Sequence, residues 1–164
     1  MLLTRLCSFI ERNIQKYYYI NKYKDNLSMG KNVYWRRGFH IIIGKDAKLR
    51  IEEGCLFNYN CSITCLGKIR IGDHTIIGEG VKMYDHNHVF NKRGINITDQ
   101  GKKVSDISIG RNCWIGSNVV ILSGTKIGNN CVIGAGSIVN GKIQDNSLLR
   151  PKVNYKIEKI SFKN

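Results

Sequence analysis

Apolar residues recur through the second half of the chain with a period of six. A β-branched aliphatic residue, usually followed by glycine, stands at every sixth position: Ile109, Ile115, Ile121, Ile127, Ile133 and Val139. The fifth position of each six-residue unit is mostly small: Cys113, Val119, Thr125, Cys131, Ser137 and Ile143. This pattern is typical of a parallel β-helix, in which three units make one triangular coil and coils stack at the strand spacing of about 4.8 Å.

The same pattern appears earlier in the chain and is interrupted once. It is clear at Ile71 and Ile77, and looser at Ile43, Leu49 and Cys55. Ile77 and Ile109 are 32 positions apart, which is five units plus two residues, so the period breaks between them. The segment MYDHNHVFNKRG, residues 83–94, lies at the break. We therefore expect about residues 84–106 to leave the coils as a loop. Loops on rigid scaffolds often carry functional residues.

These patterns divide the chain into three parts. Residues 1–26 are predicted to form an amphipathic helix, because apolar and aromatic residues alternate there with basic ones. Its apolar and aromatic members are Leu2, Leu6, Phe9, Ile10, Ile14, Tyr17 and Tyr18. Residues 27–149 form the β-helix domain, and residues 150–164 form a basic tail. The predicted fold class is all-β with an N-terminal helix.

Composition agrees with one domain in a reducing compartment. The chain has 164 residues, with 17 glycines against a single proline, which suits repeated tight corners. No apolar run is long enough to span a bilayer and no signal peptide is evident, so we expect a cytoplasmic protein. The six cysteines include no CxxC pair. We interpret Cys113 and Cys131 as corner residues, and Cys55 and Cys61 as occupants of the aliphatic position, all reduced.

The charge balance points to anionic partners. Lys and Arg number 26 against 12 Asp and Glu, a formal net charge of +14. Such a charge attracts phosphate-bearing small molecules, acidic glycans, lipid-linked phosphosugars or an anionic membrane face. Nucleic acid is disfavoured, because the basic residues are spread along the chain without a nucleic-acid-binding motif. The N-terminal segment, with Arg5, Arg12, Lys16, Lys22 and Lys24, could contact the inner membrane face, but capping the solenoid is the favoured interpretation.

Two segments carry a resemblance to a known family: residues 107–139, ISIGRNCWIGSNVVILSGTKIGNNCVIGAGSIV, and the upstream Asp-His loop. Together they resemble the hexapeptide-repeat acyltransferases. The resemblance is to the branch that O-acetylates sugars and surface polysaccharides and includes galactoside and maltose acetyltransferases. It implies a left-handed β-helix, a homotrimer, and acetyl-CoA bound between neighbouring subunits, with no metal.

The catalytic candidate is His86. Acetyl transfer to a hydroxyl requires removal of its proton near neutral pH, and imidazole is the side chain best suited to this. In the related enzymes a histidine follows directly on the coil before the loop, which is the place of His86; His88 is the alternative base. Asp85 either orients the imidazole, as a carboxylate does in a triad, or is a turn residue bonded to nearby backbone. His74 is expected to be a solvent-facing coil residue.

The resemblance also implies binding residues. Those expected to contact acetyl-CoA are Trp114, Gly116, Ser117, Gly134, Ala135 and Lys142. Glycines there let the backbone approach a ligand closely. The acceptor sugar is expected to lie against Asn58 in the stretch FNYNCSI, with Tyr84 and Asn87 of the loop.

The leading hypothesis is an acetyl-CoA-dependent O-acetyltransferase acting on a sugar hydroxyl of a surface polysaccharide or its precursor. An N-acetyltransferase of an amino sugar would use the same machinery and stays open. A metal-dependent β-helix hydratase requires three histidines to meet, and His74, His86 and His88 lack the expected spacing. A non-catalytic scaffold is disfavoured by the composition of the loop.

Overall fold

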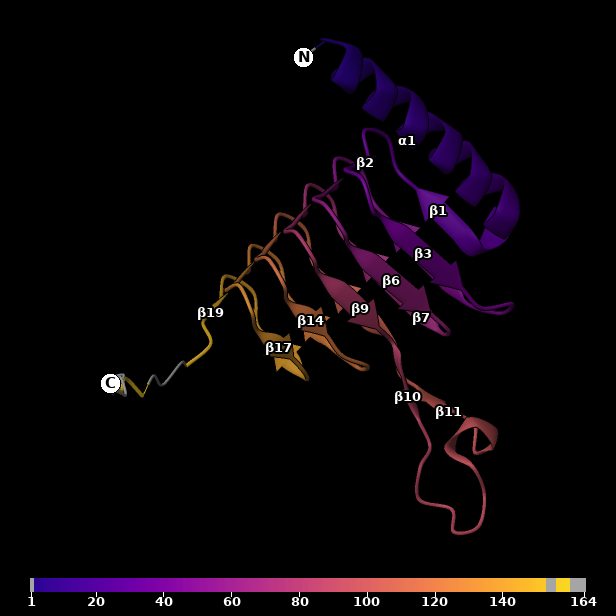
Figure 1. The fold of residues 1–164 in the computed structure, drawn as a ribbon, viewed down its shortest axis with the longest axis vertical. Coiled ribbons are helices and arrows are strands. Elements are labelled where there is room, and N and C mark those ends of the chain that lie inside the picture. Colours follow the sequence, from indigo (N-terminus) through magenta and orange to yellow (C-terminus); the bar gives the residue numbers. More distant parts are fainter. Residues whose placement is uncertain (1, 153–155, 160–164) are drawn as a thin grey trace, which may run out of the picture.

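The computed structural model describes residues 2–152 and 156–159, with side chains described from Phe9 onward. It confirms the predicted parallel β-helix with one N-terminal helix. Figure 1 shows the coils stacked along one axis, with the helix across one end and a separate arm projecting from the side. Parts of the predicted tail, residues 153–155 and 160–164, lie outside the described residues, as do the side chains of Leu2, Arg5 and Leu6.

Three parallel sheets form the faces of the solenoid. Sheet A contains β1 (Leu27–Met29), β4 (Lys48–Ile51), β7 (Lys68–Ile71), β12 (Ile107–Ile109), β15 (Lys126–Ile127) and β18 (Lys142–Ile143). Sheet B contains β2 (Tyr34–Trp35), β5 (Leu56–Phe57), β8 (Ile76–Ile77), β13 (Trp114–Ile115), β16 (Val132–Ile133) and β19 (Leu148–Leu149). Sheet C contains β3 (His40–Ile43), β6 (Ser62–Cys65), β9 (Lys82–Tyr84), β14 (Val120–Ile121) and β17 (Ile138–Val139). The chain visits A, B and C in turn, so each coil places one strand in each sheet.

The aliphatic residues of the repeat form the core. Successive residues of a strand point to opposite faces, so one residue of each pair faces inward. In sheet A, Ile51, Ile71, Ile109 and Ile127 are paired rung to rung and are at most 3% exposed. The residue before each of them points outward. The inward column of sheet A is therefore isoleucine in successive coils, whereas the outer columns are free to differ.

The corners depend on residues that tolerate a left-handed backbone. Asn112, Asn130 and Asn146 all have positive φ at the edge between sheets A and B. Their amides form a ladder, in which Asn112 Nδ2 donates to Asn130 Oδ1 and Asn130 Nδ2 to Asn146 Oδ1, each at 3.0 Å. His74 occupies the same corner one coil earlier, with φ of 54°, and its side chain is exposed as expected. Asparagine is favoured here because it tolerates this region better than most side chains.

Three sequence assignments were wrong in register. Cys55 and Cys61 occupy inward corner positions rather than the aliphatic position. Their carbonyls accept from Tyr34 N and His40 N in the preceding coil, just as the carbonyl of the corner residue Cys131 accepts from Trp114 N. Ile143 lies at the aliphatic position and not in a corner, since it pairs with Ile127 in sheet A. The physical reason is that the edges differ in length: Ile121 and Ile127 are six positions apart, whereas the equivalent Val139 and Ile143 are four apart.

The five cysteines whose side chains the structure describes are small core residues. Cys55, Cys61, Cys65, Cys113 and Cys131 are all free and buried. Burial raises the pKa of both Cys55 and Cys61 to about 11. These thiols therefore stay protonated and unreactive near neutral pH.

The helix α1 (Leu2–Tyr23) packs across the first coil and is followed by the 3-10 turn η1 (Lys24–Asn26). Side chains eight residues apart bond to that coil: Gln15 Nε2 donates to Phe39 O at 2.8 Å, and Tyr23 OH donates to Ile41 O at 2.9 Å. Tyr19, between them, is 4% exposed. The helix thus covers the open end of the core, a place where unpaired strand edges would otherwise be accessible. Within the described residues, no helix has the length and apolar character needed to cross a membrane.

Candidate functional site

The interruption of the repeat forms an arm at the edge between sheets C and A. It leaves after β9 and forms β10 (His86–His88), the 3-10 turn η2 (Ile97–Asp99) and β11 (Lys102–Val104) before entering β12. The strands β10 and β11 pair antiparallel, unlike every pair in the coils. Figure 1 shows the arm extending away from the coil stack. The solenoid register resumes unchanged, since Met83 pairs with Ile121 and Ile107 with Ile69.

Asp85 attaches the base of the arm to the coils. Its carboxylate is fully buried and accepts hydrogen bonds from Leu66 N at 2.8 and 3.0 Å and from Gly67 N at 2.8 Å. Its own carbonyl accepts from Ser105 N at 2.8 Å and Ser123 Oγ at 2.9 Å. Both ends of the arm are therefore held at one point. Charge-assisted bonds of this kind are among the stronger hydrogen bonds in proteins.

His86 stands next to this buried carboxylate. Its Nδ1 lies 3.4 Å from Asp85 Oδ1, and its side chain is 12% exposed. If Nδ1 carries the proton and directs it at the carboxylate, Nε2 keeps a lone pair for an incoming proton. Asp85 thus contacts both the backbone of the coils and the imidazole. The backbone partners of the carboxylate are Leu66 N and Gly67 N of the preceding coil, so Asp85 is not a turn residue bonded to its own backbone.

The neighbours of His86 on the arm are less constrained. Tyr84, half-buried at the end of β9, has its ring centroid 6.5 Å from that of His86. Asn87 and His88 are exposed and pair with Lys103 and Lys102 of β11. Among the hydrogen bonds of the described residues, none involves the His88 imidazole. The structure therefore gives a carboxylate neighbour to His86 alone of the two candidates.

Gln100 organises the distal part of the arm, and sequence reasoning missed it. Its side chain accepts from Lys92 N at 2.8 Å and donates to Ile95 O at 2.8 Å and Lys92 O at 3.2 Å. It is 6% exposed although the surrounding segment is polar and exposed. Each polar group of a buried amide needs a partner, and here three are satisfied. A lone glutamine in a polar loop gives no sequence signal of this role.

A second group of candidates lies at the edge between sheets B and C. Asn58, Gly116 and Gly134 each follow a sheet B strand, and those strands are in register. A Cβ added to Gly116 would lie 2.6 Å from Ala135 N, so the stacked turns exclude a side chain there. Ser117 and Ala135 come next in the same turns, and Ser117 O accepts from Gly136 N at 2.8 Å. Asn58 is half-buried, and its Oδ1 accepts from Tyr59 N at 2.9 Å.

The remaining expected acetyl-CoA contacts lie on two faces. Trp114 projects outward from sheet B with 57% of its surface exposed. Lys142 is exposed on the outer face of sheet A. The candidates therefore occupy separate faces and edges of one triangular solenoid. Within a single chain the structure does not bring His86 together with Trp114 or with the turns at the B–C edge.

The histidines of the hydratase alternative are also separated. His74 lies at the A–B edge, whereas His86 and His88 lie on the arm at the C–A edge. In the part of the chain that the structure describes, no group of three or more His, Cys, Asp or Glu side chains is placed to hold a metal ion.

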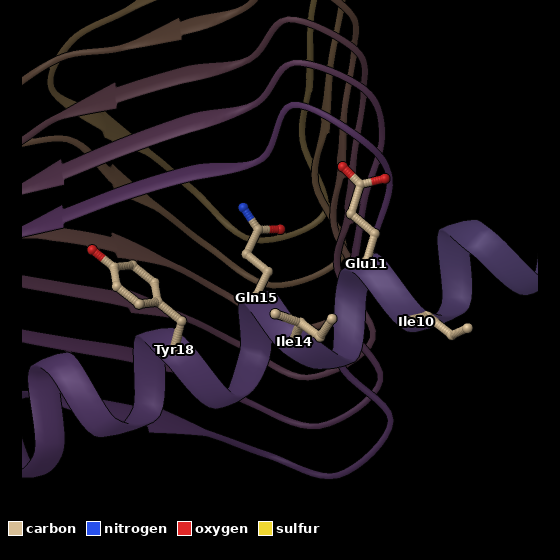
Figure 2. Close-up of a pocket in the computed structure, with 5 residues that line it drawn as sticks. All are labelled: Ile10, Glu11, Ile14, Gln15 and Tyr18. Atoms are coloured by element: carbon tan, nitrogen blue, oxygen red, sulfur yellow. The ribbon is translucent and has the colours of Figure 1, made fainter.

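An apolar groove lies elsewhere, at the N-terminal end. It follows α1 and is lined by Ile10, Glu11, Ile14, Gln15 and Tyr18 (Figure 2). Gln15 points from the helix toward the first coil, where its Oε1 accepts from Trp35 Nε1 at 2.7 Å. The groove contains none of the candidate site residues.

Comparison with known proteins supports the assignment of the repeat. Residues 106–141 match the family model described as bacterial transferase hexapeptide (six repeats). Nodulation protein L of Rhizobium leguminosarum bv. viciae is 38% identical over 99 residues, covering 59% of this chain and 49% of the relative. A galactoside O-acetyltransferase of Escherichia coli (strain K12) is 36% identical over 115 residues, covering 70% of this chain and 51% of the relative. This chain thus spans about half the length of these relatives.

A solved structure shares the architecture over most of the chain. A hexapeptide-repeat-containing acetyltransferase from Vibrio cholerae O1 biovar eltor, complexed with acetyl coenzyme A, aligns with a TM-score of 0.67 and 27% sequence identity. The alignment covers 83% of this chain and 71% of the other.

Proposed function

This chain belongs to the bacterial hexapeptide-repeat transferase family, and we propose that it transfers an acetyl group from acetyl-CoA to a hydroxyl group of a sugar in a surface polysaccharide or its precursor. The observation that carries the proposal is the pairing of His86 Nδ1 with the buried Asp85 carboxylate at 3.4 Å, at the base of an arm anchored to the coils. A base held by a rigid support is what a transfer between two bound substrates requires.

In the proposed reaction His86 Nε2 accepts the proton of the sugar hydroxyl as its oxygen attacks the thioester carbonyl carbon. A C–O bond forms, the negative charge passes to the carbonyl oxygen, and collapse of this intermediate breaks the C–S bond. The proton on the imidazole then goes to the departing CoA thiolate. Asp85 stabilises the imidazolium that exists between the two proton transfers. Its bonds to Leu66 N and Gly67 N keep it oriented throughout.

We place acetyl-CoA along the turns at the B–C edge. Gly116 lets these turns stack closely, the residues that follow Gly116 and Gly134, Ser117 and Ala135, are exposed there, and the acetyl-CoA-bound Vibrio cholerae neighbour shares this architecture. A backbone N–H near Ser117 is then available to the carbonyl oxygen as its charge develops. Trp114 would cover the pantetheine arm, whereas Lys142, on the outer face of sheet A, lies away from this edge. Asn58, on the same edge, would contact the acceptor together with Tyr84 and Asn87.

A trimer would unite these parts. The outward column of sheet B, in register from β2 to β19, is entirely apolar or aromatic: Tyr34, Leu56, Ile76, Trp114, Val132 and Leu148. Ile76, Trp114 and Leu148 are about half exposed, at 49%, 57% and 52%. A continuous apolar face on a soluble chain marks an interaction surface. We infer that it contacts another copy, so that the arm of one subunit meets the B–C edge of the next.

A separate prediction concerns contact between the N-terminal helix and a membrane. Its outer side exposes Ile10, Ile14, Tyr17 and Tyr18, while Gln15, Tyr19 and Tyr23 hold it on the first coil. Peripheral contact with an anionic membrane from the cytoplasmic side stays a prediction. Liposome sedimentation of the whole chain, with and without anionic lipid, tests it.

The experiment for the proposed reaction is a transfer assay. The protein is incubated with acetyl-CoA and a panel of oligosaccharides, nucleotide sugars and amino sugars, with free CoA thiol and product mass as readouts. We expect an acetyl ester on a hydroxyl; an amide as the only product would replace O-transfer by N-transfer.

The catalytic assignment has a matched control on the same strand. We expect His86→Ala to lower kcat by about 10²- to 10⁴-fold, the usual contribution of a positioned base, with acetyl-CoA affinity retained. His88→Ala should stay within about threefold of the wild type, because its imidazole lacks the carboxylate neighbour. Loss of activity in His88→Ala with retention in His86→Ala would contradict the assignment.

A further inference from the structure

The outer face of sheet A carries a straight column of basic residues. The strand register places six outward residues side by side, one on each rung: Ser28, Arg50, Arg70, Ser108, Lys126 and Lys142. Four of the six are cationic. Lys48 and Lys68 form a second, shorter column beside the first.

Fold stability does not explain this column. Like charges directly opposite each other on neighbouring strands destabilise a sheet. The outward column of sheet B is apolar, and that of sheet C is mixed: His40, Ser62, Lys82, Val120 and Ile138. The same fold therefore tolerates other outward residues. The basic column is a property of one face.

Little negative charge opposes the column within the chain. Glu52 bonds both arginines, with Oε1 at 2.7 Å from Arg50 Nε and 3.1 Å from Arg70 Nε. No salt bridge among the described residues involves Lys126 or Lys142, and both are exposed. The upper part of the column is thus open to an external anion.

Acidic side chains around the face lie at its edges. Asp106 Oδ1 accepts from Lys68 N at 3.1 Å, at the C–A edge. Asp145, at the A–B edge, accepts from Asn129 N at 3.0 Å, and the pKa of its carboxyl is lowered by this bond and by the nearby charges of Arg111 and Lys142. Neither carboxylate stands within the column.

The column has the shape of a binding track for a linear chain. Neighbouring rungs are about 4.8 Å apart, so Arg50 and Lys142 are separated by about 19 Å along the axis. A membrane surface would be met better by charges spread over a plane. A chain with an anionic group on successive sugars presents charges in a line, and guanidinium groups bind carboxylates in pairs of hydrogen bonds.

The track passes the base of the arm. Gly67 N and Lys68 N, at the start of β7, donate to Asp85 and Asp106, which are the first and last acidic residues of the arm. The arm adds Lys102 and Lys103, both exposed, on β11 opposite His88 and Asn87. A chain lying on sheet A would therefore run close to the strand that carries His86.

We propose that the outer face of sheet A binds the acceptor, and that the acceptor is a linear glycan with acidic groups on successive sugars. This inference rests on the proposed function for its catalytic meaning, but the binding surface is defined by the column alone. The acidic groups lie along Arg50, Arg70, Lys126 and Lys142, and a hydroxyl of a sugar at the level of β7 and β12 reaches His86.

Binding of the full chain to an oligogalacturonate, compared with a neutral malto-oligosaccharide of equal length, tests the surface. Titration calorimetry without acetyl-CoA should show binding of the acidic chain at least about tenfold tighter at low salt, falling as salt screens the charges. Arg70→Gln combined with Lys126→Gln should weaken it by about fivefold to thirtyfold, since exposed ion pairs contribute modestly. Arg50 continues to pair with Glu52 in this variant.

The matched control removes two exposed positive charges outside the column, by Arg37→Gln and Lys82→Gln. It should keep binding within about twofold. Equal binding of acidic and neutral chains, or an equal loss in the control, would overturn the proposal. So would binding of phosphatidylglycerol vesicles or a DNA oligonucleotide that depends on Arg70 and Lys126 while the oligogalacturonate does not bind.

The two proposals fail differently. If the column binds the acidic chain but no acetyl transfer occurs to any acceptor, the proposed function fails and the surface stands. If neutral sugars are acetylated as well as acidic ones, and Arg70→Gln with Lys126→Gln changes nothing, the surface fails and the transferase stands.

Discussion

The outward columns of sheets A and B differ completely, although the inward columns behind them are both apolar and largely buried. Behind Arg70 and Lys126 lie Ile71 and Ile127; behind Ile76 lies Ile77. The interior therefore specifies the solenoid without specifying its surface. The coil tolerates any outward residue that fits a strand, so an outward column of mainly one chemical type indicates what that face contacts. We infer a second subunit on the apolar face of sheet B and an anionic chain on the basic face of sheet A.

The largest effect should come from placing a charge on the apolar face. Ile76→Glu puts a carboxylate in the middle of the sheet B column, and burial of an unpaired charge at an interface is strongly unfavourable. We expect light scattering to give the monomer mass of 18.7 kDa in place of a trimer. Activity should fall by about 100-fold or more, since the two halves of the site no longer meet.

Lys126→Glu is the matched change on sheet A and should leave the trimer intact. A monomeric wild type, or a trimer in both variants, would show that sheet B is not the subunit interface. The distinction between the two faces would then need another explanation.

Equal losses are expected from the inward columns. Ile71 and Ile77 are both fully buried, one in sheet A and one in sheet B of the same coil. Ile71→Ala and Ile77→Ala should each lower the free energy of unfolding by about 2–5 kcal/mol, through lost burial and the cavity left behind. Urea denaturation measures this. A loss confined to one sheet would mean that the two interiors are not equivalent.

The period of six was enough to predict the solenoid, because it is local and repeated. The paired residues Ile115 and Ile133 are 18 positions apart, which is three units of six, so the strand positions there follow directly from the period. Phe57 and Ile77 are 20 apart, and Ile133 and Leu149 only 16. Edge lengths depend on which turns the corners adopt, so Cys55, Cys61 and Ile143 were misplaced.

The site was predicted only in part, for a different physical reason. The arm follows from the broken period and the choice of His86 from the family resemblance, but neither shows that Asp85 bonds to Leu66 and Gly67, some 18–19 positions away. The outer columns likewise appear only once the register is known. A spacing pattern cannot show which side chains become neighbours when coils of unequal length stack.

Alkaline pH should weaken the edge that joins the two sheets. Cys55 lies between β4 of sheet A and β5 of sheet B, and burial raises its pKa from 9.0 to about 11, as it does for Cys61. The folded state holds these protons more tightly than the unfolded state. The stabilisation is therefore complete below pH 9 and is lost as pH rises toward 11.

Chemical denaturation between pH 8 and 11 measures the loss. In Cys55→Ala with Cys61→Ala the decline over this range should be shallower than in the wild type, although the starting stability is lower. An identical slope in the two proteins would show that other groups cause the alkaline instability.

The smallest effect should come from neutralising one cation of the sheet A column. Lys126 is paired in register with Lys142, and Arg70 lies beyond Ser108 on its other side. Removing like-charge repulsion of this kind is expected to change the free energy of unfolding by about 0.5 kcal/mol or less, in the stabilising direction. Added salt should stabilise the wild type slightly more than Lys126→Gln, because screening relieves the same repulsion. A loss above about 1 kcal/mol would mean that Lys126 stabilises the fold. The column would then need no external anion to account for it.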